Sequence, residues 1–220
     1  MKDNIIVTRI CNHIKAQIMS KEMFPGYRII EDELASRLGV SRTPLRRAFA
    51  QLQYEGFLDI IPNRGTFVIK PTYDEIRRVY EARACLEEGL AASAVNHVTE
   101  EDIEDLEENY RKQVAMLDSF NIVDYSALNR DFHMRLAAIS NNEYLKKYVE
   151  EIHNRIFVFL VYYDNSVNNA GSSVTHKTII DALKNRDYES LIEGIRADAS
   201  LGSEDIFRSR TDFLLDDATL

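Results

Sequence analysis

Apolar residues recur at intervals of three and four along most of this 220-residue chain, which is the spacing of one face of an α-helix. In the first part of the chain this pattern predicts three helices, carried by residues 5–18, 34–38 and 45–52. Gly39 lies where the second helix should end, and Ser41 lies where the third should have its N-cap. The short interval between these two helices predicts a helix–turn–helix.

Two short apolar runs, residues 57–61 and 66–69, follow the third predicted helix. The segment between them, Pro62–Gly65, is rich in residues that favour turns, so we predict a β-hairpin. A helix–turn–helix followed by a β-hairpin is a winged helix–turn–helix, and this is the fold predicted for residues 1–71.

The rest of the chain shows the helical pattern throughout. Thr72 and Thr99 are each followed three residues later by an acidic residue, the signature of a capped helix start. Residues 164–172 are predicted to form an exposed loop. The predicted helices are 73–97, 99–118, 121–139, 142–163, 173–185 and 187–215. The predicted fold class is therefore mainly α, with an N-terminal winged helix–turn–helix followed by an all-α antiparallel helical bundle.

Proline content and charge both change near residue 71. All four prolines lie in residues 1–71, and proline breaks helix interiors. The same residues hold 11 Lys and Arg against 7 Asp and Glu, a net charge of +4, whereas residues 72–220 hold 16 against 29, a net charge of −13. We therefore predict two domains, 1–71 and 72–220. The overall charge of −9, which taken alone argues against a nucleic-acid partner, combines a basic domain with an acidic one.

The composition excludes several classes of protein. With 45% hydrophobic and 29% charged residues, the chain has enough apolar material for a core. Two cysteines are too few for a disulfide framework, and no apolar run approaches the roughly 18 residues that cross a membrane. Charged residues interrupt the N-terminal segment, which therefore does not read as a signal peptide. We expect a cytoplasmic protein without a membrane partner.

The start of the third predicted helix carries side chains suited to DNA. Ser41 and Thr43 can donate hydrogen bonds to phosphates, and Arg42 and Arg46, one turn apart, can each bind guanine or a phosphate. Arg47 adds a further cation. An arginine pair alone most often lies on a solvated face, but this one lies between a predicted turn and a predicted hairpin. We therefore expect this helix to enter the major groove.

The predicted hairpin carries two further candidates at its tip. Arg64 would place a guanidinium near the adjacent minor groove, and Gly65 would allow a close approach to the DNA. The recognition helix and the hairpin together predict a surface that reads duplex DNA.

A series of short motifs runs through the first predicted domain: Pro25-Gly26, Glu31-x-x-Leu34-Ala35, LGVSRTPLR at 38–46, Leu52, Glu55-Gly56 and Pro62-x-Arg64-Gly65-x-Phe67-Val68. Together they resemble the GntR family of bacterial transcription regulators. The resemblance implies DNA contacts by Ser41, Arg42, Thr43, Arg46, Arg64 and Gly65. Two positions depart from the family pattern. Asp32 stands where many members have a DNA-contacting arginine, and Arg47 stands in place of the usual glutamate.

Looser motifs mark the second predicted domain: Arg83-x-x-Leu86-Glu87, Leu128-Asn129-x-x-Phe132-His133, Asn142-x-x-Leu145, and His176 with Ala182 and Asp187. They resemble the FCD effector domain of the FadR-type GntR subfamily. The resemblance implies a metal site, where the family usually has Asp, His, His and His, at Asn129, His133, His176 and Asp198. This set keeps one carboxylate, and its nitrogen and oxygen ligands suit Zn²⁺, Ni²⁺ or Mn²⁺.

Each of these residues has a structural alternative. His133 and His176 could be hydrogen-bonded core histidines, and Asp198 could be a solvated acid. Arg83 could bind a carboxylate effector beside the metal, or it could pair with Glu87, one helical turn away. The remaining histidines are interpreted as surface or packing residues: His13, His97 and His153.

The resemblance implies a metabolite-responsive transcription regulator, most simply a repressor. A homodimer would read a short palindromic operator, and a small organic acid would bind through Arg83, His133 and His176, with or without a divalent metal. Two alternatives stay open at this point. A metal-free regulator would bind the acid directly through those side chains. A metal-dependent hydrolase would use the same histidines to activate water, although no general base stands beside them at a motif spacing.

Overall fold

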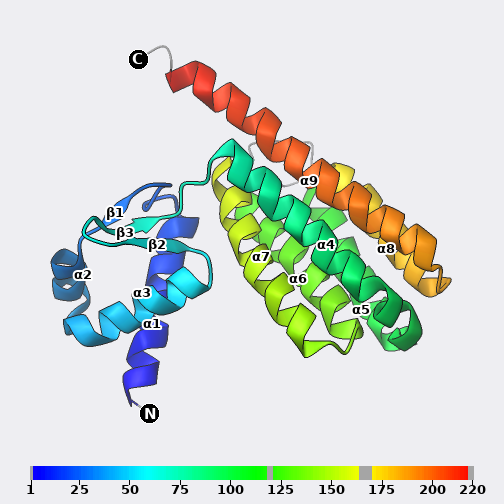
Figure 1. Ribbon diagram of the computed structural model, residues 1–220, viewed down its shortest axis with the longest axis horizontal. Coiled ribbons are helices and arrows are strands. Elements are labelled where there is room, and N and C mark those ends of the chain that lie inside the picture. The colour runs from blue at the N-terminus through cyan, green and yellow to red at the C-terminus, as the bar shows by residue number, and fades with distance from the viewer. Residues whose placement is uncertain (1, 118–120, 164–169, 218–220) are drawn as a thin grey trace. The chain divides into compact units, whose positions relative to one another are not determined.

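The chain forms two compact units, Met1–Pro71 and Thr72–Leu220, which are described separately (Figure 1). The computed structural model describes residues 2–117, 121–163 and 170–217, with side chains described within 4–117, 121–161 and 174–204. Most of the described residues are helical, as the apolar spacing predicts.

The first unit is a winged helix–turn–helix. Its helices are α1 (Lys2–Met19), α2 (Glu31–Leu38) and α3 (Arg42–Tyr54), and its strands are β1 (Arg28–Ile29), β2 (Leu58–Ile61) and β3 (Gly65–Val68). The three strands form an antiparallel sheet in the order β1-β3-β2. The hairpin of β2 and β3 was predicted. Strand β1 was missed because two residues are too short to show an alternating pattern.

In the turn between α2 and α3, Gly39 and Ser41 occupy the two helix-cap positions predicted for them. Gly39 ends α2 in the left-handed conformation, with φ of 63°, and its N–H bonds to carbonyls of the last turn. Ser41 occupies the N-cap of α3, as predicted, but its side chain makes no capping hydrogen bond. Helix α1 packs against α3, and Ile14 and Leu45 are both fully buried. This packing fixes the buried side of α3 and leaves its opposite side exposed.

The second unit is an all-helical bundle. Its helices are α4 (Tyr73–His97), α5 (Glu100–Met116), α6 (Ile122–Ile139), α7 (Glu143–Tyr163), α8 (Ala170–Lys184) and α9 (Tyr188–Asp217). Predicted and observed ends mostly agree within two residues. The exception is the predicted loop 164–172: residues 170–172 belong to α8, and 164–169 lie outside the described residues.

Capping explains why two of these helices begin where they do. Thr72 accepts a hydrogen bond from the Glu75 N–H, and the Glu75 carboxylate accepts one from the Thr72 N–H. Thr99 and Asp102 form the same reciprocal pair at the start of α5. These are the two capping boxes that the sequence predicts.

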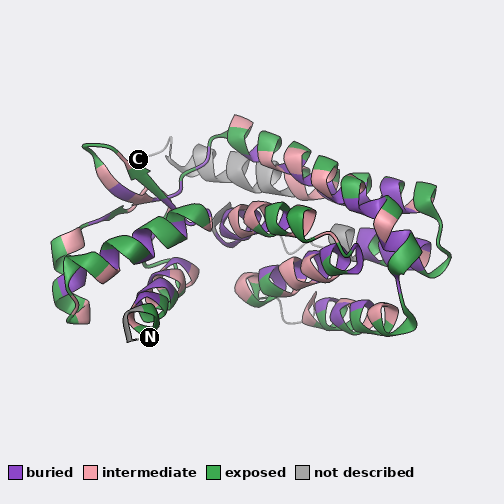
Figure 2. Ribbon diagram, turned by 60° about the horizontal axis from the view of Figure 1, so that its bottom comes forward, coloured by how far each residue is buried: buried purple, intermediate pink, exposed green. Residues whose placement is uncertain are grey.

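Helix α4 packs against α6, α7 and α9. Buried and exposed residues alternate along the bundle helices, as expected for amphipathic helices (Figure 2). One large apolar cluster joins α4, α5, α6, α8 and α9 through residues such as Ala94, Leu106, Phe132, Ile180 and Leu191. Polar residues are also buried in this bundle, and they mark its candidate site. Among the described residues, no helix is long and apolar enough to cross a membrane.

Candidate functional sites

The exposed side of α3 carries the residues predicted to contact DNA. Leu45, Ala48, Phe49 and Leu52 are buried on one side of this helix. The predicted contacts at its N-terminal end are all exposed, namely Ser41, Arg42, Thr43, Arg46 and Arg47. A helix that is anchored on one side and cationic at the N-terminal end of the other can present those side chains to a DNA groove.

Acidic residues of α2 pair with the arginines of α3. Arg42 Nη2 lies 2.7 Å from Asp32 Oδ1, and Arg46 Nε lies 2.9 Å from Glu31 Oε2. Arg47 Nη2 donates instead to Asn4 Oδ1 of α1, at 3.1 Å. Exposed ion pairs contribute about 1 kcal/mol or less, so a phosphate can replace the carboxylate partner of either arginine.

An additional cation, Arg28, lies beside the tip of the hairpin, and the motifs do not single it out. Arg64 is exposed, as predicted, and Gly65 has a φ of 116°, which disfavours other residues. The side chain of Arg28 lies beside Gly65, where an added Cβ would come within 3.3 Å of Arg28 Nε. Arg28 belongs to β1, the strand that the sequence did not reveal, so its position beside the hairpin could not be predicted.

A buried polar cluster lies inside the helical bundle, with contributions from every helix from α4 to α9. Arg83 and Glu87 come from α4, His133 from α6, His153 from α7, His176 from α8 and Asp198 from α9, with Gln113 from α5. Each of these seven residues is at most 3% exposed. Buried polar groups are costly unless they are paired, so the contacts within this cluster decide what it can do.

The hydrogen bonds orient the rings of His133 and His176. His133 Nδ1 lies 3.1 Å from Glu87 Oε1, and His176 Nδ1 lies 3.0 Å from Gln113 Oε1. Both partners are oxygen acceptors, so each Nδ1 carries the hydrogen and each Nε2 is left with its lone pair. The two Nε2 atoms lie 3.3 Å apart. Two lone pairs at this separation, with no hydrogen between them, require a cation or another donor.

Asp198 faces the same point. Its carboxylate oxygens lie 3.5 Å from His133 Nε2 and 3.5 Å from His176 Nε2. Thr175 donates a hydrogen bond to Asp198 Oδ1, and Arg83 donates one to Asp198 Oδ2. The second bond also neutralises the buried carboxylate.

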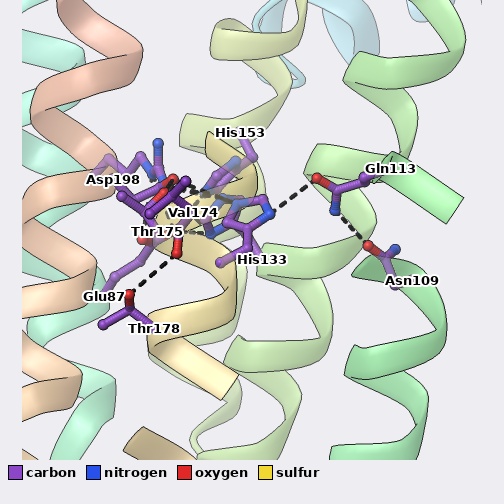
Figure 3. Close-up of polar contacts among 11 residues, drawn as sticks. Glu87, Asn109, Gln113, His133, His153, Val174, Thr175, Thr178 and Asp198 are labelled. Carbon is purple, nitrogen blue, oxygen red and sulfur yellow. Dashed lines mark hydrogen bonds and ion pairs between the residues drawn. The ribbon is translucent and has the colours of Figure 1, made fainter. Parts of the chain in front are cut away.

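A chain of amides supports the cluster from outside. Gln113 Nε2 donates to Asn109 Oδ1 at 2.6 Å, and Asn109 Nδ2 donates to Asp131 Oδ2 at 2.9 Å. Figure 3 shows Gln113 joined to Asn109 on one side and to the histidine cluster on the other. This chain fixes the amide orientation of Gln113, and thereby the tautomer of His176.

Burial sets the protonation state of the three imidazoles. Burial and the nearby Arg83 lower the pKa of His133 from 6.5 to about 3. Burial lowers the pKa of His176 to about 4, although Asp198 opposes the shift, and burial also lowers the pKa of His153. All three rings are therefore neutral near pH 7.

The two carboxylates remain ionised. Burial raises their pKa values, but Arg83 together with the histidines and hydrogen-bond donors around them outweighs burial and holds the pKa of Glu87 and of Asp198 below the ordinary values. Arg83 stays protonated because Glu87 and Asp198 offset the burial that would lower its pKa. One guanidinium and two carboxylates leave these six groups with a net charge of −1.

The donor set fits a divalent metal. Two nitrogen ligands at about 2.0–2.1 Å from a tetrahedral ion are separated by roughly 3.3 Å, and the two Nε2 atoms have this separation. A metal-binding histidine usually donates its other N–H to a carboxylate, backbone carbonyl or water, and here His133 donates to Glu87 and His176 to Gln113. One carboxylate oxygen and two imidazole nitrogens suit Zn²⁺, Ni²⁺ or Mn²⁺.

The structure brings together three of the four residues that the resemblance implies as ligands. One ligand atom each from His133, His176 and Asp198 lie within 4.8 Å of one another. The fourth residue, Asn129, is buried one turn before His133, but it is absent from the hydrogen bonds described for this cluster. Asp198 is 2% exposed, so the alternative of a solvated acid is wrong.

The sequence does not single out two residues of the cluster, His153 and Gln113. His153 is 1% exposed, and its Nε2 donates to Glu87 Oε1 at 2.6 Å, so it belongs to this polar cluster and is not a surface or ordinary packing residue. His153 has no motif around it, and Gln113 lies in a helix with many polar residues, so only the packing of the helices identifies them.

The ion pair between Arg83 and Glu87 is present, as one of the two interpretations of Arg83 requires. Arg83 Nε lies 3.3 Å from both Glu87 oxygens. The pair is not isolated, because Arg83 also contacts His133 and Asp198. The contacts place Arg83 within the candidate site, and they agree with both interpretations.

Comparison with known proteins assigns both units to families of transcriptional regulators. Residues 6–68 match the bacterial regulatory proteins of the gntR family, and residues 78–198, more than half of the chain, match the FCD domain. The chain therefore belongs to the GntR family of regulators that carry an FCD domain. It is a DNA-binding transcriptional regulator, so the hypothesis of a metal-dependent hydrolase is not retained.

Several relatives support this assignment. The Nta operon transcriptional regulator of Aminobacter aminovorans is 38% identical over 132 residues, which cover 60% of this chain and 62% of that protein. The transcriptional repressor RspR of Escherichia coli is 32% identical over 117 residues, 53% of this chain and 51% of the relative. The solved structure of E. coli McbR/YncC has a TM-score of 0.78 at 23% identity and covers 93% of this chain and 98% of that one. This last likeness shows the shared fold.

The ion pair of Arg42 with Asp32 leads to a prediction about DNA binding. Asp32→Asn removes a carboxylate that holds Arg42 and repels phosphate. We expect several-fold tighter binding to duplex DNA, and a salt dependence steeper by about 0.9 in the slope of log K against log salt, because one more phosphate contact is formed and its counterion is released. Fluorescence anisotropy at several salt concentrations measures both.

Glu33→Gln is the matched control, since Glu33 is an exposed acid of the same helix and the change in charge is the same. If the control tightens binding as much as Asp32→Asn does, the effect comes from net charge and not from Arg42.

The low pKa of His176 predicts a pH dependence of stability in the metal-free protein. In the unfolded chain this imidazole gains a proton near pH 6.5, but in the folded protein it does so only near pH 4. The contribution of His176 to stability is therefore fully present above pH 6.5 and is lost as the pH falls toward 4, by about 1.4 kcal/mol per pH unit, in addition to the contributions of His133 and His153. Urea unfolding in EDTA between pH 6 and pH 4.5 measures this slope.

His176→Gln should reduce that slope by about 1.4 kcal/mol per pH unit, which corresponds to one proton. His97→Gln, at an exposed histidine that ends α4, should leave it unchanged. An unaltered slope in His176→Gln would show that the imidazole is not held neutral by burial.

Proposed function

We propose that this chain is a metabolite-responsive repressor, in which a divalent metal held by His133, His176 and Asp198 helps to bind a small carboxylate effector. The observation that carries the proposal is the convergence of two imidazole lone pairs and one carboxylate inside the bundle, with the Nε2 atoms 3.3 Å apart. Three acceptor groups with this geometry form a cation site.

The DNA-binding half of the proposal rests on the exposed side of α3 and on the hairpin. Two copies of Met1–Pro71 in a homodimer would read the two halves of a short palindrome, because operator symmetry follows protein symmetry. In each copy, Ser41, Arg42, Thr43, Arg46 and Arg47 would face the major groove, and Arg64 and Gly65 would approach the minor groove. The name of the relative RspR supports repression as the direction of control. Such a protein would act in the cytoplasm, at its operator.

The effector half rests on the buried cluster. His133, His176 and Asp198 would hold the ion, Glu87 and Gln113 would keep the two imidazoles in the ligating tautomer, and Asn129 would be the remaining candidate ligand. A bound ion would supply a Lewis acid that attracts a carboxylate. Arg83 offers a guanidinium for the same anion. Binding would change the packing of the helices that supply these residues and so bias the two DNA-binding units.

A second candidate function keeps the regulator and omits the metal. Arg83 Nη2 lies 3.0 Å from His133 Nε2 and donates a hydrogen bond to Asp198. A cationic side chain therefore already contacts two of the three candidate metal ligands. In this alternative an organic acid would bind directly to Arg83, His133 and His176. Chelation distinguishes the two candidates, because it would leave effector binding intact only in the metal-free regulator.

The operator prediction is tested by selection from a pool of random duplex DNA. The full chain should enrich a short inverted repeat, and Arg42→Ala or Arg46→Ala should weaken binding to it by about 1–3 kcal/mol. Arg77→Ala, at an exposed arginine of α4, is the control and should bind as the wild type does. Enrichment of no sequence, or of one without symmetry, would contradict recognition by a homodimer.

The metal prediction is tested by zinc binding. The wild type should bind about one zinc ion per chain, and His133→Gln and His176→Gln should each lose most of it. Glu87→Gln keeps the three ligands but removes the carboxylate that orients His133, so it should weaken zinc binding by about 10- to 100-fold. Elemental analysis and competition with a chromogenic chelator measure these effects.

The exposed His97 again provides the control, because His97→Gln should bind zinc normally. Retention of full zinc content by the double variant His133→Gln/His176→Gln would place any metal elsewhere and support the metal-free alternative.

A further inference from the structure

The guanidinium of Arg83 lies at the point where the candidate ligand atoms converge. Its Nη2 donates to Asp198 Oδ2 and lies 3.0 Å from His133 Nε2, while its Nε lies 3.3 Å from both oxygens of Glu87. One buried cation thus contacts both buried carboxylates and one of the two candidate imidazole ligands. The proposed metal needs the same Asp198 carboxylate and the same lone pair of His133 Nε2.

We propose that Arg83 is the resident cation of this cluster when no metal is bound, and that a divalent ion displaces it. The displaced guanidinium then becomes the binding group for a single carboxylate of the effector. This inference rests on the proposed function and adds an order to it: the metal binds first, and the anion follows.

Arg83 and a divalent ion cannot both bind to His133, because a neutral imidazole offers a single lone pair. A neutral imidazole has one unprotonated ring nitrogen with one lone pair. In His133 this nitrogen is Nε2, because Nδ1 faces the Glu87 carboxylate at 3.1 Å. Nε2 can accept the Arg83 N–H or coordinate an ion, but it cannot do both. Metal binding therefore breaks the contact between Arg83 and His133.

Arg83 cannot bind an external anion while its present contacts persist. Its donors are directed at Glu87 and Asp198, which together carry two negative charges. An ion coordinated by Asp198 takes over the neutralisation of that carboxylate and releases Nη2. The anion site at Arg83 is therefore formed by metal binding, and it is closed in the metal-free protein.

Charge specifies the class of effector. Arg83 pairs with both Glu87 and Asp198, so these three charged side chains give the cluster a net charge of −1. A divalent ion changes this to +1, and one carboxylate restores neutrality. An uncompensated charge is unfavourable inside a bundle, so the site suits an organic acid that presents one carboxylate to the cluster.

Zinc titration of Arg83→Met tests the displacement. Methionine fills similar space without charge, so the ion no longer competes with a guanidinium. We expect zinc to bind about tenfold or more tightly than to the wild type, which is the size of effect that one charge within about 4–6 Å has on a neighbouring ionisable group. We also expect zinc to raise the melting temperature of this variant more than that of the wild type.

Arg196→Met is the matched control, because Arg196 pairs with Glu88 on the exposed surface of the same bundle. Its zinc affinity should equal that of the wild type. Unchanged or weaker zinc binding by Arg83→Met would overturn the displacement, because it would show that Arg83 and the ion do not compete.

Two measurements on the wild type do not depend on the folding of a variant. In ¹⁵N-edited NMR spectra, the side-chain resonances of Arg83 should shift when zinc is added, and resonances that stay unchanged would overturn the proposal. Sodium acetate, the monocarboxylate probe, should raise the melting temperature relative to sodium chloride only when zinc is present. Equal stabilisation without zinc would show that the anion site is open in the metal-free protein.

The outcomes also separate this inference from the proposed function. If the wild type binds no zinc, the proposed metal site and the displacement both fail. If zinc binds through His133 and His176 but Arg83→Met changes nothing, the metal site stands and only the exchange with Arg83 is wrong.

Discussion

The helical bundle depends on the compensation of charges that it buries. Arg83, Glu87 and Asp198 are each at most 3% exposed, and α4 and α9 are joined through the bond from Arg83 to Asp198. Removing one partner of a buried ion pair typically costs 3–5 kcal/mol, because the other charge is left uncompensated. This constraint ties the stability of the bundle to its ligand chemistry, since any ion or anion that enters must rebalance the same charges.

Helix capping and helix packing together position the groups that orient His133 and His176. Capping boxes begin α4 and α5, and the packing of α4 against α6, α7 and α9 brings Glu87 to within hydrogen-bonding distance of His133 and His153. Glu87 thereby selects the tautomer in which His133 Nε2 is unprotonated and keeps its lone pair. Gln113 does the same for His176 from the other side. The two nitrogens of the proposed metal site are thus oriented by neighbours outside the proposed ligand set.

The sequence predicted the elements well and the cluster in part. The spacing of apolar residues and the two threonine caps placed the bundle helices, because those signals are local. Motifs identified His133, His176 and Asp198, whose convergence the structure shows. His153, Gln113 and strand β1 escaped prediction because their importance arises from tertiary packing, which brings α7 and α5 against α6 and α8, and β1 against β3. The pairing of Asp32 with Arg42 likewise depends on the angle between two helices.

The central claim is that His133, His176 and Asp198 hold a divalent metal. Anomalous diffraction at the zinc edge, from crystals of the full chain grown with zinc and without chelator, tests it most directly. We expect a strong peak about 2.0–2.2 Å from His133 Nε2, His176 Nε2 and an oxygen of Asp198, with Arg83 withdrawn from that oxygen. A peak between Glu87 and His153, or no peak inside the bundle, would contradict it.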